Sequence, residues 1–288
     1  MGFEQWILAH EAAIRLGFFF GVFALMAVWE LMAPRRALTV SKAGRWASNL
    51  GLVALNTVVL RLTFPAAAVG MALLASGRGW GLFNNYEAPV AVAVLASVLL
   101  LDLAIYLQHV MMHAVPALWR LHRVHHADLD FDLTTGARFH TLEILLSMLI
   151  KFAVIVVLGP PALAVVIFEV LLNATAMFNH SNVRIPAPVD RWLRLFVVTP
   201  DMHRVHHSIE DDETNSNFGF NLPWWDRLFG TYRAQPRAGH EAMTIGIRTF
   251  RDPKQCDRLP GMLAMPFVGK VRDYAINRRN WGKANDTV

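Results

Sequence analysis

Cysteine is almost absent from this sequence: Cys256 is the only one among 288 residues. A single cysteine excludes an intramolecular disulfide and argues against a metal site built on thiolates. Any metal site in this chain would therefore have to use nitrogen ligands from histidine or oxygen ligands from carboxylates.

Charged residues are also scarce. They make up 17% of the sequence, whereas hydrophobic residues make up 55%, and soluble domains usually carry roughly 25% charged residues. The apolar residues gather in long runs at 13–33, 49–76, 88–110 and 142–177. Because a helix of about 20 apolar residues can cross a bilayer, these runs predict a polytopic membrane protein and exclude an ordinary water-soluble domain.

The positive charges lie mainly in the loops between apolar runs and near the C-terminus, and they give a net charge of +5. This distribution favours contact with anionic lipid headgroups over nucleic-acid binding. The short basic loop at 34–45 should lie in the cytoplasm by the positive-inside rule. We predict an integral protein of the inner or plasma membrane with helices at 14–33, 48–75, 88–112, 141–158 and 161–179. The last two meet at Pro160-Pro161 and form either a full or a shallow hairpin.

The chain shows no long linker or low-complexity tract, so we expect a single all-α domain over residues 1–288. Its helical base, with four to five transmembrane helices, would extend over about 14–180. A cytoplasmic helical cap, built from 113–140 and 180–240, would hold a two-metal site. The basic segment 241–288 would lie on the membrane surface.

Histidine is strongly clustered, because eight of the 12 histidines fall into three spaced groups. The groups are an H-x-x-x-H pair and two H-x-x-H-H triads: His109 and His113; His122, His125 and His126; and His203, His206 and His207. Positions i, i+3 and i+4 share one face of a helix, so we expect each group to point its imidazoles at a common spot. Eight ligands exceed what one tetrahedral metal uses and therefore predict two metals.

Four further residues are candidates for this site. His180 follows the fifth predicted helix, close to where the groups should gather, and we predict it as a ligand. His140 begins the fourth helix and fits a ligand or an interfacial histidine equally well. Glu143, one turn later, would ligate a metal, orient a ligand or stabilise the helix dipole. Asp102 shares a helix face with the first pair and would orient a ligating histidine or bond to another helix.

Taken together, these motifs resemble the fatty acid hydroxylase/sterol desaturase superfamily of membrane-bound, histidine-rich di-iron oxygenases. Matching accessory stretches are DLAIYLQHVMMH at 102–113, LWRLH at 118–122, NHSN at 179–182 and WDRLFGTY at 225–232. The resemblance extends over about 29–232 and implies an O₂-dependent non-haem di-iron enzyme that hydroxylates or desaturates lipids. It also implies that Asn217, in a stretch similar to the family's Asn-aromatic-Gly motif, supports the metal ligands.

The sequence departs from the family pattern in two places. Some members have a second histidine four residues before the position of His180, where this chain has Ala176. The second metal would then recruit His140, water or a side-chain oxygen. The chain also lacks a cytochrome b5-like domain, which implies a separate ferredoxin or cytochrome-type electron donor. An acidic donor or lipid phosphates would contact a basic surface formed by Arg120, Arg123, Arg204, Arg227 and Arg233.

Ligation by nitrogen alone is compatible with iron, zinc, copper or nickel. We predict two iron ions, which zinc or another metal can replace in a purified sample, with O₂ as co-substrate. The predicted reaction is hydroxylation of a membrane lipid C–H bond, and desaturation by the same site is the alternative. A non-redox zinc protein is a third possibility. A transporter is disfavoured because the histidines gather at one end of the helices instead of along a path. The acidic run 210–213 favours a solvated loop over a second, carboxylate-rich metal site.

Overall fold

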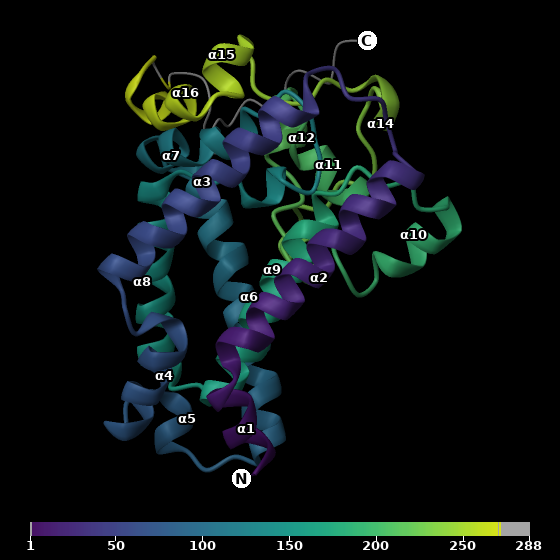
Figure 1. The fold of residues 1–288 in the computed structure, drawn as a ribbon. Coiled ribbons are helices and arrows are strands. Elements are labelled where there is room, and N and C mark those ends of the chain that lie inside the picture. The colour runs from purple at the N-terminus through teal and green to yellow at the C-terminus, as the bar shows by residue number, and fades with distance from the viewer. Residues whose placement is uncertain (1, 270, 272–288) are drawn as a thin grey trace.

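The computed structural model describes residues 2–269 and 271. Within this part of the chain every named element is a helix, as the sequence predicts. The long helices of the base are α2 (Glu11–Met32), α3 (Lys42–Thr63), α4 (Ala67–Gly77), α6 (Val90–Ala114), α8 (Thr141–Leu158) and α9 (Ala162–Asn179). Five segments, with α3 to α5 taken as one, are long and apolar enough to cross a membrane. The chain is therefore an integral membrane protein (Figure 1).

The expected helix over 48–75 is in fact two helices, and this prediction is wrong. The first begins six residues earlier, where the Ser41 side chain accepts a hydrogen bond from the Gly44 N–H and caps α3. It ends at Thr63 because Pro65 has no amide hydrogen and disfavours helical backbone at Phe64, whose φ and ψ are −131° and 73°. The chain bends there before α4 begins.

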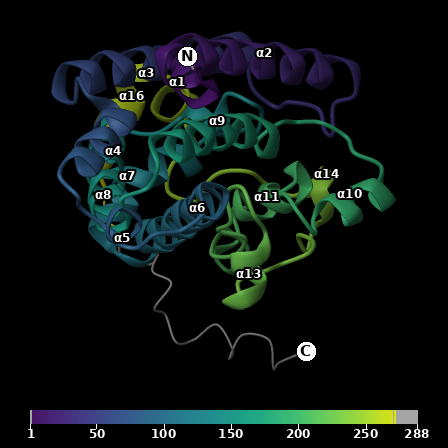
Figure 2. The ribbon, with the colours of Figure 1, turned by 90° about the horizontal axis from the view of Figure 1, so that it is seen from below.

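Helix α9 lies at the centre of the base, in contact with α2, α4 and α6, and the view from below shows α2 and α6 on either side of it (Figure 2). Helices α8 and α9 have 18 residues each, or about 27 Å of rise, which is close to the thickness of the hydrocarbon core of a bilayer. Gly159, with a φ of 59°, makes the left-handed turn between them. The length favours the full hairpin.

Three charged side chains inside the base pair with one another. Glu169 on α9 accepts a hydrogen bond from Lys151 on α8 at 2.9 Å and forms an ion pair with Arg15 on α2 at 3.0 Å. The Glu169 side chain is only 5% exposed. Because unpaired charges are costly at membrane depth, these contacts explain how the apolar helices tolerate the three residues, and they connect α2, α8 and α9.

The short helices form a cap at one end of the base, opposite α1 (Phe3–Ala9) and α5 (Leu82–Asn85) (Figure 1). They are α7 (Pro116–His126), η1 (Thr135–Ala137), α10 (Ala187–Leu193), α11 (Pro200–His206), α12 (Asp211–Thr214), α13 (Trp224–Leu228), α14 (Gly239–Ala242), α15 (Pro253–Cys256), α16 (Leu259–Ala264) and η2 (Met265–Phe267). The cap therefore includes elements on both sides of α8 and α9 in the sequence.

The described part of the basic C-terminal segment packs on the cap, which differs from the prediction that 241–288 lies on the membrane surface. Cys256, Met262 and Met265 are buried in a core cluster with Leu52 of α3 and Trp119 of α7. Burying this apolar area on the protein outweighs spreading a basic helix on lipid. Residues 272–288 lie outside the described part of the structure.

Candidate metal centre

Nine histidines converge where the base meets the cap, and they form two groups. The five-histidine group consists of His109, His113, His122, His126 and His206, and the four-histidine group consists of His125, His180, His203 and His207. Within each group, one nitrogen of every ring lies within 4.8 Å of the others. All nine side chains are buried. The structure thus brings together all eight clustered histidines and His180.

Each H-x-x-H-H motif contributes to both groups, so the expectation that a triad points at one spot is wrong. On α7 the first and last histidines join the five-histidine group, and His125 joins the other. On α11 the assignment is reversed, and only His206 joins the five-histidine group. The reason is that residues i+3 and i+4 project about 100° apart around a helix. Two such helices on either side of the centre can therefore serve two metals.

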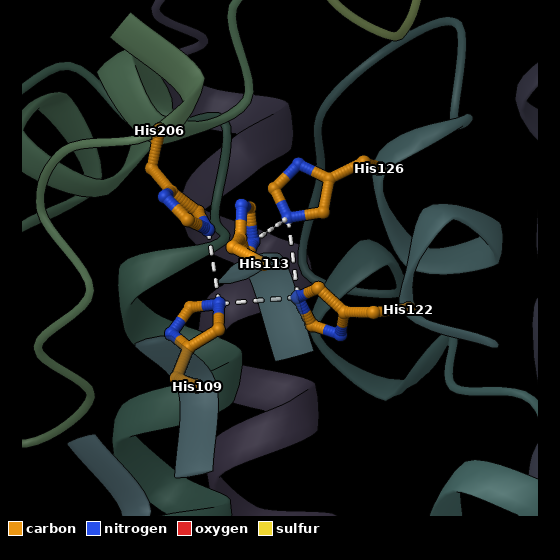
Figure 3. Close-up of side chains that lie close together, drawn as sticks. All are labelled: His109, His113, His122, His126 and His206. Atoms are coloured by element: carbon orange, nitrogen blue, oxygen red, sulfur yellow. Dashed lines mark hydrogen bonds between the residues drawn. The ribbon is translucent and has the colours of Figure 1, made fainter. Parts of the chain in front are cut away.

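The spacing of the ring nitrogens suits a metal ion. In the five-histidine group, His109 Nε2 lies 3.1 Å from His122 Nε2 and 3.0 Å from His206 Nε2 (Figure 3). In the other group, His180 Nε2 lies 3.2 Å from His125 Nε2 and 3.0 Å from His203 Nε2. Nitrogens bound at about 2.0–2.1 Å to one ion are themselves about 3 Å apart. In both groups, the ring nitrogens therefore have the spacing that is expected around a bound metal ion.

The outer nitrogens show which ring atoms are left for a metal. His109 and His206 each donate from Nδ1 to a backbone carbonyl, at 2.8 and 2.7 Å. His122 donates from Nδ1 to Glu143 Oε1 at 2.6 Å. A neutral imidazole that carries its hydrogen on Nδ1 has only a lone pair on Nε2. The His109 Nε2 lone pair then faces those of His122 and His206 at 3.1 and 3.0 Å, an arrangement that a shared cation would stabilise.

The surroundings of several cap imidazoles favour the neutral form. Burial, followed by the neighbouring histidines, lowers the pKa of His125, His126, His203 and His207 well below the usual value. Burial also lowers the pKa of His180 to about 3. Neutral imidazole is the form that binds metal, so these rings are ready ligands near neutral pH.

Aromatic rings surround the two groups. Phe139 stacks on His125 with centroids 4.4 Å apart and planes 12° apart. Phe131 stacks on His180 at 5.6 Å, and Phe218 lies 5.1 Å from His113. These rings limit the access of water to the centre. Phe131 and Phe139 belong to no histidine motif, so their place beside the two groups could not be predicted from the sequence.

Two of the predicted supporting residues contact no histidine ring. The Asn217 amide bonds to the Met202 carbonyl and to the backbone of Arg233, and it holds its loop on α11. The amide that does contact a ligand is Asn215, whose Oδ1 lies 3.2 Å from His113 Nδ1. Asn217 thus supports the centre only through the backbone.

Asp102 accepts hydrogen bonds from the Trp225 indole at 2.8 Å and from the Leu222 N–H at 3.3 Å. It therefore fixes the segment around α13 against α6. Asp102 lies seven residues, or about 10 Å of helix rise, from His109. This distance explains why its carboxylate bonds to the segment around α13 and not to that histidine ring. Of the two predicted roles, the orientation of a histidine is wrong and the bond to another element is correct.

His140 belongs to neither group, so its prediction as a metal ligand is wrong. Its Nδ1 accepts from the Leu142 N–H at 3.2 Å and caps the N-terminus of α8. Its Nε2 lies 3.3 Å from the Leu263 carbonyl of α16. Both ring nitrogens are thus engaged outside the centre.

The acidic run and the basic residues of the cap neutralise one another. Glu210 pairs with Arg248, and Asp212 pairs with Arg233, so the run is a set of ion pairs and not a separate metal site. Of the expected basic surface, Arg123 and Arg204 are buried. These two of the five arginines are therefore not available to an acidic donor or to lipid phosphates.

Known proteins that are similar to this chain are lipid hydroxylases and monooxygenases. Residues 94–231, which include all nine histidines, match the family model for fatty acid hydroxylase. The chain is 26% identical to the ornithine lipid hydroxylase OlsE of Rhizobium tropici over 263 residues, which cover 89% of this chain and 76% of that protein. It is 29% identical to human alkylglycerol monooxygenase over 53% of this chain and 33% of that protein.

A third relative, cholesterol 25-hydroxylase of Rattus norvegicus, is 26% identical over 50% of this chain and 48% of that protein. The chain thus spans most of the first relative but half or less of the other two. No solved structure matches the chain. The matched segment, the helical fold and the two histidine groups together show that residues 94–231 form a domain of the fatty acid hydroxylase family.

Proposed function

We propose that this protein hydroxylates a membrane lipid C–H bond with O₂ at a di-iron centre held by its nine histidines. The observation that carries the proposal is the pair of buried histidine groups at one end of membrane-spanning helices. Iron, when bound, supplies the redox chemistry that O₂ activation requires. One oxygen atom enters the C–H bond, and the other leaves as water with two electrons and two protons. A separate ferredoxin or cytochrome-type donor would supply these electrons.

The chain's own residues would position and protect this centre. The histidines hold the metals, and Glu143 fixes the orientation of His122. The surrounding aromatic rings exclude water. His109 and His180 lie at the ends of α6 and α9, so a lipid chain could approach from the bilayer while electrons arrive through the cap.

The relatives guide the choice of substrate. OlsE is described as an ornithine lipid hydroxylase, and its similarity covers most of both chains. An amino-acid-containing membrane lipid is therefore the first substrate to test, followed by alkylglycerol and sterol lipids. We also propose that the cap faces the cytoplasm, because the basic stretch 34–45, which includes the connection between α2 and α3 and the first turn of α3, lies at the cap end of the base (Figure 1).

Lipid mass spectrometry tests the reaction. Cells that express the wild-type chain should accumulate a lipid with one added oxygen, and cells with His125→Ala/His206→Ala, which removes one ligand from each group, should not. His10→Ala is the matched control, because His10 is exposed and lies outside both groups. A lipid that instead loses two hydrogens would identify a desaturase. A preparation free of iron that keeps full activity would refute the di-iron proposal and favour zinc.

A further inference from the structure

We infer that the two histidine groups hold metal unequally: the five-histidine group binds its ion tightly, and the four-histidine group releases its ion first. This inference rests on the two-metal centre of the proposed function. It concerns which residues retain a metal and not which reaction follows.

The first reason is the number of ligands. Helix α6 gives the five-histidine group two rings four residues apart, His109 and His113. The other group receives His180, the residue directly after α9, and the position four residues earlier on α9 is Ala176. The α7 and α11 motifs contribute three histidines to each group. The four-histidine group therefore lacks one nitrogen ligand relative to its neighbour.

The second reason is the support behind each ring. In the five-histidine group, four rings have an acceptor at Nδ1: His109, His113, His122 and His206. In the four-histidine group only His180 has one, the Ala176 carbonyl at 2.8 Å. Among the described residues, neither Nδ1 of His125 and His203 nor either nitrogen of His207 has a hydrogen-bond partner.

This difference in support affects metal affinity. An acceptor behind a ligating imidazole fixes its tautomer and its orientation, and losing one such partner typically weakens metal binding about 10- to 100-fold. The unsupported rings of the four-histidine group must lose more rotational freedom when they bind an ion. The missing ligand and the missing acceptors act in the same direction. We therefore expect the two affinities to differ by at least about tenfold.

Competition with a chelator tests this inference on the full chain in detergent or nanodiscs. The protein is loaded with Fe²⁺ without oxygen, its iron is counted by elemental analysis, and a chelator is then titrated. We expect two ions per chain, released in two steps that need chelator concentrations at least about tenfold apart. Anomalous diffraction from crystals of protein with one remaining ion should place that ion among His109, His113 and His206.

Two variants provide a matched comparison. His207→Ala should remove the early step and leave the late one, whereas His113→Ala should shift the late step toward the early one. Thermal unfolding without metal identifies a variant that does not fold, and in that case the wild-type diffraction decides. Release of both ions in one step, or a remaining ion in the four-histidine group, would overturn the inference alone. A chain that binds no iron would instead refute the proposed function.

Discussion

Glu143 carries a carboxylate that is almost fully buried at the start of α8, and its contact with His122 is the shortest one behind any of the nine rings. Replacing it with alanine removes the acceptor and leaves the ring free to turn. Glu143→Ala should therefore weaken iron binding in the five-histidine group about 10- to 100-fold, which chelator competition measures. Glu143→Gln keeps an oxygen acceptor and should lose less. Equal losses in both variants would mean that the negative charge, and not the hydrogen bond, matters.

His140 gives the opposite expectation, because it caps α8 and ligates nothing. His140→Asn should keep both iron ions, since asparagine is itself a strong N-cap residue. His126→Ala, in the five-histidine group, should lose iron. Elemental analysis of the two purified variants checks the difference. Iron loss in His140→Asn would return His140 to the ligand set.

The convergence of the clustered histidines could be predicted from sequence because their spacing is local and helical. The partners of Asp102 and Asn217 could not, because they depend on contacts between distant parts of the chain. Asp102 bonds to Trp225, which is remote in sequence, and Asn217 bonds across to Met202. Spacing also could not separate the ligands of one metal from those of the other, since that depends on how α7 and α11 face each other.

At the scale of elements, η1 and α9 approach closely at Gly136. A Cβ atom there would lie 2.5 Å from the Ala176 carbonyl oxygen and 2.9 Å from His180 Nδ1. Gly136→Ala should therefore push η1 away from α9 and disturb the hydrogen bond behind His180. We expect a loss of about 1–3 kcal/mol in stability and iron loss from the four-histidine group, measured by thermal unfolding and elemental analysis.

The matched control for this prediction is Gly17→Ala in α2, where a Cβ would meet nothing within 4 Å. It should leave the iron content unchanged. If both variants behave alike, the close contact at Gly136 does not position His180.

The break between α3 and α4 illustrates a related point about prediction. The apolar run continues through Pro65, so hydrophobicity alone hid a boundary that the proline imposes.

For the molecule as a whole, the ion pairs around Glu169 join three membrane helices. Glu169→Leu leaves Lys151 and Arg15 facing each other without their shared anion, and breaking such a buried pair costs about 3–5 kcal/mol. The double variant Lys151→Met/Glu169→Leu should recover much of this loss, because it removes the uncompensated lysine. Thermal unfolding in nanodiscs compares the variants. A double variant no more stable than Glu169→Leu would show that Lys151 does not contribute.

Composition and apolar runs predicted the membrane-spanning, all-helical character of the whole chain, because the bilayer imposes length and hydropathy on each span. They did not predict where the C-terminal segment lies. Its basic charge suggested lipid, whereas its buried residues, among them Met262 and Met265, pack on α3 and α7. The burial of a few side chains therefore places the C-terminal segment on the protein. The net charge of the segment gives no indication of this packing.

The packing of this segment also sets an order of events during synthesis. The ribosome completes the last of the nine grouped histidines at His207, but η2, whose Met265 carbonyl accepts from Arg123 of α7, follows roughly 60 residues later. At translation rates of about 5–20 residues per second, this interval lasts about 3–12 s. During that time a nascent chain has all nine histidines and no C-terminal cover over α7. We expect metal delivered during this interval to meet a cap that still lacks the contacts of its C-terminal segment with α3 and α7.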